Sequence, residues 1–399
     1  MSFKIIDSDR HVMEPIEIWQ KYADTSIYSK APVYLQEQSS GECSQADDLA
    51  LPPLIMIGDV SIFKNWNKEE IIASAYKSQG IQNKLEAGMS ALGQIRSMDA
   101  SGTLKACMFP SFAMYIVNHQ DITAEVSLEY AYAYNRWLKD YCLVDPKRLK
   151  PVGIISRHSP SNMCEQLQRV IDNGWTAITI RPEMISGRCL GHEENEDFWA
   201  ACQAHNIAVA FHGGTNLQAP TVGSDRFTSR FSLHACSHPM EAQMAFLSLL
   251  EFGVLERYPK LKFAFLEAGA SWVPHWLWRL DNICYPEFPS LVRNNIRMLP
   301  SEYFKRQCWV TIEIGEPCLR EVIEVIGHEK LLYGSDFPHP DHLQFTTENI
   351  RTQLAELSES EIQCLLHSNA YDFFGLNEQP EGNVMALQDK KELVDLEHE

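Results

Sequence analysis

The sequence predicts an α/β protein whose fold is a (β/α)8 TIM barrel. Short apolar runs rich in β-branched and aromatic residues alternate with longer amphipathic runs, the pattern of parallel strands joined by crossover helices. Polar or glycine-containing residues follow every short run. At 399 residues, the chain is long enough for one such barrel, which typically needs about 250 residues.

Eight runs have the length and composition of buried strands. The first, Phe3–Ile6, is followed by the letters DSDRH, and the last, Lys330–Tyr333, by GSDFPHPD. The six between them are Leu104–Phe109, Lys150–Ile155, Ala177–Ile180, Ile207–Phe211, Lys262–Leu266 and Trp309–Ile312. Because active sites of this fold lie at the C-terminal ends of the strands, the polar segments after these runs are the places to look for chemistry.

Amphipathic segments between these runs predict the helices. The clearest is Ile122–Tyr141, which has apolar and aromatic residues at helical spacing and is closed by DPKRL. Turn residues and proline mark the ends of the other segments. They are Ser161–Asn173, Glu194–His205, Met240–Tyr258 and Glu316–Ile326.

The stretch between the first two strands departs from this regular alternation. Residues 16–97 contain polar and proline-containing segments and one predicted short helix, Glu69–Ser78. We interpret residues 1–376 as a single barrel with this stretch as an inserted lid subdomain at its mouth, where functional loops gather. A plain surface excursion is an equal alternative. Residues 377–399 form a charged C-terminal tail.

Composition narrows the classes of function. The formal charge of −19 argues against nucleic acid or an anionic membrane as partner. The sequence contains no apolar run of about 18 residues, and its first residues lack the apolar core of a signal peptide. The eleven cysteines form no CxxC pair and indicate reduced thiols. We therefore expect a cytoplasmic protein that acts on a small molecule.

Histidine and acidic residues stand where strands are predicted to end. Asp9 and His11 are two apart, so their side chains can point the same way after the first strand. His212 follows the fifth run and Asp336 the eighth. Imidazole and carboxylate groups suit Zn²⁺, Mn²⁺ or Fe²⁺. Each residue alone is weak evidence, since a single strand-end histidine is more often structural and GSDFPHPD could be an Asx-turn.

At these positions the chain resembles a known family. The segments IDSDRHVMEP, AFHGG, LEAGASWVPHWLWRLD and LLYGSDFPHPD are similar to the amidohydrolase superfamily, especially its branch with aminocarboxymuconate-semialdehyde decarboxylase. The resemblance spans residues 3–16 and 98–376. It implies a homodimeric barrel with one divalent metal ion, held here by Asp9, His11, His212 and Asp336.

The chain departs from the family pattern at two positions. Asp9 stands where a histidine is usual, and an oxygen ligand makes the site harder, so manganese becomes more plausible beside zinc. Zinc stays the first expectation, with manganese or iron as alternatives. Glu267 stands where many members carry a histidine after the sixth strand. A carboxylate there could act as acid and base or bind the metal. An ion pair with a basic neighbour such as Arg279 is the structural alternative.

Four further residues are candidates with open alternatives. His238 could be a catalytic group at the pocket or simply sit near a helix N-terminus. Arg181 could clamp a substrate carboxylate through a bidentate fork, but an ion pair with Glu183 or Glu267 would explain it equally well. His158 faces the same choice between substrate binding and a structural contact. His339 could reach either the substrate or solvent.

Two reactions fit these residues. The first expectation is hydrolysis of an amide, ester or lactone by a metal-activated water, with Asp336 taking the water's proton. The alternative is non-oxidative decarboxylation of a small aromatic or unsaturated carboxylic acid, in which a protein acid supplies the proton that replaces CO2. Glu267 in place of histidine favours hydrolysis. A third hypothesis, a barrel without catalysis that serves as a binding module, conflicts with the complete-looking ligand set.

Overall fold

The centre of the molecule is a ring of parallel strands. The computed structural model describes residues 3–37, 53–62, 87–215, 219–287, 289–339 and 349–376. One sheet has the order β1-β5-β6 and a second the order β12-β11-β10-β9-β8-β7. The strands of the ring are β1 (Ile5–His11), β5 (Thr103–Phe109), β6 (Leu149–Pro151), β7 (Gly153–Ile154), β8 (Ala177–Ile180), β9 (Ala208–His212), β10 (Lys262–Leu266), β11 (Cys308–Ile312) and β12 (Leu331–Tyr333).

Two junctions turn these sheets into one barrel. β6 pairs with β5 and β7 with β8, and only Val152 separates β6 from β7, so they are two halves of the predicted third strand. At the other junction, the amide of Asp336 donates to the carbonyl of Asp9 at 2.9 Å. The amide of His11 donates to the carbonyl of Phe337 at 2.7 Å. Eight strand positions therefore follow one another, and the predicted α/β barrel is confirmed.

Apolar side chains fill the structure on both sides of the strands. The interior of the barrel holds alternate strand residues, among them Ile6, Cys107 and Ala264. Helix α20 (Asn369–Phe374) adds Phe373 and Phe374 to this cluster and closes the end of the barrel where the strands begin. A larger apolar cluster lies between the strands and the surrounding helices. The opposite end of the barrel, where the strands finish, is left for polar side chains.

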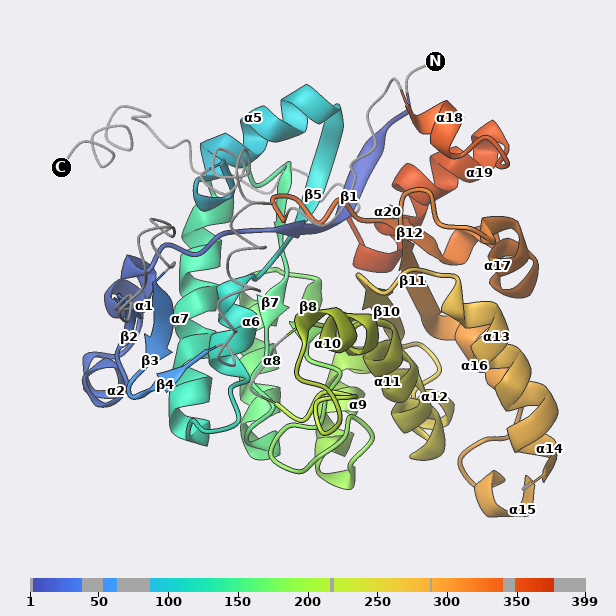
Figure 1. Cartoon of the computed structure of the whole chain (residues 1–399), viewed down its shortest axis with the longest axis horizontal. Coiled ribbons are helices and arrows are strands. Elements are labelled where there is room, and N and C mark those ends of the chain that lie inside the picture. The colour runs from blue at the N-terminus through green and yellow to red at the C-terminus, as the bar shows by residue number, and fades with distance from the viewer. Residues whose placement is uncertain are drawn as a thin grey trace, which may run out of the picture.

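Helices surround the ring (Figure 1). The helix predicted over Met240–Tyr258 is divided at Gly253, whose φ of 73° is left-handed. The helix predicted from Glu316 begins three residues later because Cys318 has a φ of 67°. The principal helices are α7 (Ala124–Cys142), α8 (Met163–Asp172), α9 (Glu196–Ala204), α11 (Pro239–Glu251), α12 (Val254–Arg257), α16 (Pro300–Gln307) and α17 (Leu319–Ile326).

Shorter elements follow several strands and end the chain. Single turns of 3-10 helix precede α8, α9 and β12. The remaining helices are α6 (Phe112–Val117), α10 (Arg230–Ser237), α13 (Trp272–Arg279), η3 (Leu280–Cys284), α14 (Tyr285–Glu287), α15 (Pro289–Val292), α18 (Ile350–Gln353), α19 (Glu359–Gln363) and η5 (Cys364–Ser368). No helix in the described part of the chain is long and apolar enough to cross a membrane.

The segment between β1 and β5 holds a small antiparallel sheet of β2 (Val33–Gln36), β3 (Leu54–Ile57) and β4 (Val60–Ser61). It also contains helices α1 (Glu17–Tyr22), α2 (Thr25–Lys30) and α5 (Ala91–Ser101). The ring of Trp19 meets that of Tyr130 on α7 edge-on at 5.6 Å, and Figure 1 shows α1, α2 and the small sheet beside α7. The predicted helix Glu69–Ser78 and the tail lie outside the described residues, so the lid stays a prediction.

Candidate metal centre and active site

Strand β1 carries the first two candidate ligands. It extends to His11. Asp9 and His11 therefore lie within the strand, whereas the sequence had predicted that they follow it. The pairing of β1 with β5 shifts register between Asp7 and Arg10, and bulges of this kind re-aim side chains beside active sites. Asp9 Oδ1 lies 3.4 Å from His11 Nε2. The two side chains therefore face the same point.

The other candidates come from three more strand ends. His212 is the last residue of β9, Glu267 directly follows β10, and Asp336 comes shortly after β12. Glu267 and Asp336 both have a φ of 50°, a left-handed conformation that residues other than glycine adopt mainly where function requires it. The amide of Glu267 donates to Thr311 Oγ1 at 3.0 Å. The seam between β12 and β1 holds Asp336.

These side chains converge on one point. His11 Nε2 lies 3.0 Å from His212 Nε2 and 3.1 Å from Asp336 Oδ1. His212 Nε2 lies 3.1 Å from Glu267 Oε2 and 3.6 Å from Asp9 Oδ1. Two imidazoles and three carboxylates from four strands thus meet at the carboxyl end of the barrel, as predicted for Asp9, His11, His212 and Asp336.

Backbone carbonyl groups fix how both imidazoles present their nitrogens. Nδ1 of His11 lies 2.8 Å from the Pro110 carbonyl oxygen, and Nδ1 of His212 lies 2.9 Å from that of Gly213. A carbonyl can only accept, so both Nδ1 atoms carry hydrogen and both Nε2 atoms direct a lone pair to the same place. Two lone pairs 3.0 Å apart repel each other unless a proton or a metal ion lies between them.

The donor set fits a divalent metal ion. Asp9 Oδ1 is buried and has no hydrogen-bond partner among the described residues, which is costly unless a cation satisfies it. Separations of 3.0–3.6 Å are those expected between neighbouring ligands of an ion bound at about 2.0–2.2 Å. His11, His212, Glu267 and Asp336 form a group whose ligand atoms lie within 4.8 Å of one another.

The electrostatics of the cluster also favour a cation. Burial opposes protonation of His11, but Asp336 and Asp9 raise its pKa well above the ordinary value. Burial likewise opposes protonation of His212, and Asp9 and Glu267 raise its pKa. Both shifts express an excess of negative charge that a divalent ion would neutralise.

His339 lies directly over this cluster. Its ring centroid is 4.3 Å from that of His11, its Nδ1 lies 2.8 Å from Asp336 Oδ1, and its Nε2 lies 2.9 Å from Ser111 Oγ. Burial and the charge of Glu267 oppose ionisation of Asp336, but His339 and His11 together hold its pKa below the ordinary range. His339 therefore faces the candidate centre, where substrate would bind. This agrees with the first of its two predicted alternatives, contact with substrate or with solvent.

His238 lies on the other side of Glu267. Its Nε2 is 3.4 Å from Glu267 Oε1, and its Nδ1 is 3.0 Å from Ser237 Oγ. Burial lowers the pKa of His238 to about 4. A Cβ at Gly213 would come within 2.7 Å of the His238 ring, which explains the glycine directly after His212. Glu267 thus faces His212 and His238.

The two remaining candidates lie in buried networks. Arg181 is almost fully buried; its Nη2 and Nε donate to Glu183, and its Nη1 donates to the Gly213 carbonyl. His158 Nδ1 lies 3.0 Å from Ser127 Oγ, and its Nε2 lies 3.0 Å from the His119 carbonyl oxygen. The geometry therefore favours the structural alternative to substrate binding for both residues.

The sequence did not predict some of the groups at the candidate metal centre. The carbonyls of Pro110 and Gly213, which orient the two histidines, carry no side-chain signal. Ser111, which contacts His339, stands in the PSF segment after the second strand. Its position at a strand end is the sequence feature that could have marked it as a site residue.

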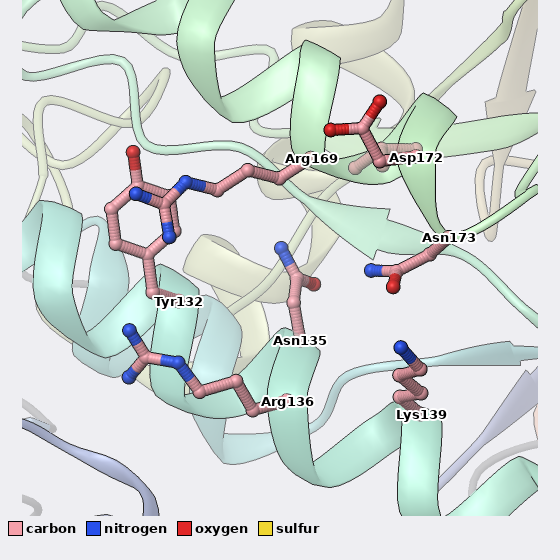
Figure 2. A pocket seen from close by; sticks show the side chains of 8 residues that line it. Tyr132, Asn135, Arg136, Lys139, Arg169, Asp172 and Asn173 are labelled. Atoms are coloured by element: carbon pink, nitrogen blue, oxygen red, sulfur yellow. The ribbon is translucent and has the colours of Figure 1, made fainter.

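A second charged region lies on the outer wall of the barrel, away from the strand ends. A pocket of about 250 Å³ between α7 and α8 is lined by Tyr132, Arg136, Lys139, Arg169 and Asp172, among others. Figure 2 shows the guanidinium of Arg169 over the ring of Tyr132, 3.9 Å from its centroid. The described residues that line it include no histidine or cysteine. We therefore place the candidate active site at the strand ends.

Comparisons with known proteins agree with this fold. Over 289 residues the chain is 23% identical to 2-amino-3-carboxymuconate-6-semialdehyde decarboxylase of Dictyostelium discoideum, covering 68% of this chain and 78% of that one. An amidohydrolase of Mycobacterium avium subsp. paratuberculosis has a similar structure, with a TM-score of 0.73, 21% identity, and coverage of 94% of this chain and 100% of the other.

A third similar structure holds a metal ion. It is 5-carboxyvanillate decarboxylase of Novosphingobium aromaticivorans with bound manganese, with a TM-score of 0.65, 18% identity, and coverage of 94% of this chain and 97% of the other. These structural likenesses show the shared fold. The model of the amidohydrolase family matches residues 6–376, nearly the whole barrel. The chain belongs to the amidohydrolase family.

Proposed function

We propose that the protein is a metal-dependent, non-oxidative decarboxylase of a small aromatic or unsaturated carboxylic acid. The observation that carries this proposal is the buried cluster of imidazoles and carboxylates at the strand ends, in which Asp9 Oδ1 accepts no hydrogen bond from the described residues. Relatives that are named decarboxylases favour this reaction over the hydrolysis expected first from the sequence.

Asp9, His11, His212 and Asp336 would hold the divalent ion, and Glu267 is the candidate for a fifth ligand. When bound, the ion attracts the substrate's carboxylate and a neighbouring oxygen and stabilises negative charge that develops on the substrate. Manganese, bound in a relative, is the first ion to test, and zinc, expected from the sequence, is the second.

The reaction also needs a proton. Loss of CO2 breaks the bond between the carboxylate and its carbon and leaves an electron pair on that carbon, which must then bind H⁺. His339 is in contact with Asp336 through Nδ1 and has 26% of its side chain exposed, so it connects the buried carboxylate with the barrel mouth. We assign His339 as the donor of this proton, with Asp336 Oδ1 orienting its imidazole through Nδ1.

Burial of the cluster supports the same reaction. His11 and Asp336 are shielded from water, and a charged carboxylate leaves as uncharged CO2, a change that a site with little water assists. Hydrolysis of an amide, ester or lactone could use the same residues, with Asp336 taking a proton from water.

The homodimer and the cytoplasmic location expected from the sequence also remain predictions.

The direct test is an assay of CO2 release. Protein loaded with Mn²⁺ or Zn²⁺ is incubated with a panel of aromatic and unsaturated carboxylic acids, and with matched amides and esters. We expect CO2 from at least one acid. We expect Asp336→Asn to lower its rate by about 10²–10⁴-fold, while Asp197→Asn, an exposed carboxylate on α9, should have no effect. Cleavage of amides or esters without any CO2 release would overturn the proposal in favour of hydrolysis.

A further inference from the structure

A second group of potential metal ligands adjoins the first. His234 on α10, His238 at the start of α11 and Glu267 place ligand atoms within 4.8 Å of one another. We propose that these three side chains hold a second divalent metal ion, and that Glu267 bridges the two ions. The inference rests on the proposed function, because it requires the first cluster to be a metal site.

Glu267 is placed to serve both clusters. Its Oε2 lies 3.1 Å from His212 Nε2 in the first cluster, and its Oε1 lies 3.4 Å from His238 Nε2 in the second. Each carboxylate oxygen thus faces a different imidazole. The left-handed φ of 50° at Glu267 sets this direction immediately after β10.

The contact between His238 and Glu267 has the length of a ligand–ligand separation. At 3.4 Å it is longer than the roughly 2.7–2.9 Å of a charge-assisted hydrogen bond. It matches the distance between two ligands of one ion bound at about 2.0–2.1 Å. Ser237 Oγ donates to the His234 carbonyl at 3.4 Å, so it can accept from His238 Nδ1, and Nε2 then presents its lone pair to Glu267.

His234 completes the set from the side of the solvent. Its ring centroid is 5.3 Å from that of His238, and the residue is partly exposed. Two histidines and one carboxylate are a ligand set of catalytic zinc, which keeps an open position for another oxygen. An ion here would face the barrel mouth. It therefore suits a substrate that carries a second anionic oxygen group besides the carboxylate that leaves as CO2.

Metal stoichiometry tests the inference. Metal-free protein is equilibrated with excess Zn²⁺, passed through a desalting column and analysed for zinc, for wild type, His234→Ala, His238→Ala and His205→Ala. His205 is an exposed histidine at the end of α9 and serves as the control. We expect two equivalents in wild type and in His205→Ala, and one equivalent in each of the other two variants.

A spectroscopic readout tests the bridge. With Mn²⁺ in place of Zn²⁺, wild type should give the electron paramagnetic resonance spectrum of a spin-coupled pair, and His234→Ala that of an isolated ion. One equivalent in wild type, or two in His234→Ala, would overturn the second site and leave the proposed function standing. No bound metal in wild type would overturn both. Two equivalents with uncoupled spectra would overturn the bridging role of Glu267.

Discussion

Charged side chains gather in two regions of this molecule, and the two regions neutralise charge differently. At the strand ends, Asp9, Glu267 and Asp336 surround two imidazoles out of contact with bulk water. Between α7 and α8, by contrast, Arg169 has its own partner, Glu165, at 2.9 Å, and both are about half exposed. Water and local partners neutralise the second region, whereas the first needs a ligand. We therefore place the candidate site where buried charge is uncompensated, and not at the pocket between α7 and α8.

The largest effect is expected from His212→Ala. The variant removes the imidazole whose Nε2 faces His11 at 3.0 Å, so the bound ion should be lost together with the decarboxylase activity. The loss of metal affinity should exceed the roughly 10–100-fold that typically follows substitution of a residue hydrogen-bonded to a metal ligand. Metal analysis after dialysis and an activity assay measure both, with His205→Ala as control. Unchanged metal content would remove His212 from the ligand set.

The next largest effect is expected from Arg181→Met, which breaks a buried ion pair. Glu183, whose side chain is 0% exposed, would be left as an unpaired buried charge, and the Gly213 carbonyl would lose a donor. Such a change typically costs about 3–5 kcal/mol of stability. Urea unfolding measures the loss, and Arg181→Met/Glu183→Leu should recover much of it. A cost below about 1 kcal/mol would contradict the buried pair.

A smaller effect, dependent on pH, is expected at Glu241. Burial is the main cause that raises the pKa of this carboxyl to about 8, and the charge of Glu183 is the second. Its ordinary value, expected in the unfolded chain, is 4.5. The folded state therefore binds the proton more tightly, and its stability falls as pH rises from about 5 to 8.

Glu241→Gln keeps the oxygen that accepts from the Val222 amide and removes the titration. The free energy of unfolding, measured at pH 5 and pH 8, should therefore change less in this variant than in wild type. An equal change in both proteins would assign the pH dependence to other groups.

The smallest effect is expected from Arg169→Met in the outer pocket. This half-exposed arginine loses an ion pair and a contact with the ring of Tyr132, which are worth about 0.2–1 kcal/mol each at such sites. Thermal unfolding in low and high salt measures the cost, which salt should reduce. A loss as large as that of Arg181→Met would erase the contrast between the two regions.

The strand ends were predictable from sequence because their apolar runs and the polar residues after them leave a local signal. β8 and β10 have the predicted bounds. β1 was predicted too short, since the run IIDSDRH loses its apolar character where its side chains turn toward the site. The break at Gly253 and the late start of α17 depend on left-handed residues whose conformation helical periodicity does not reveal.

The site was only partly predictable, for a related reason. Asp9, His11, His212 and Asp336 were predicted as ligands because ionisable groups at strand ends can converge at the mouth of a closed barrel. The sequence could not decide whether Arg181 meets substrate or Glu183, because that choice depends on how two side chains separated by one residue fold back on each other. Nor could it place His234 and His238 against Glu267, since α10 and β10 come together only through packing.

The seam between β12 and β1 has a consequence for how the protein is made. The amides of Asp336 and His11 tie together the two ends of the barrel, and these same residues belong to the candidate metal centre. During synthesis on the ribosome, His11 emerges long before Asp336. The centre can therefore form only after the last strand has been made, so a prematurely terminated chain could fold much of its sheet without acquiring the complete site.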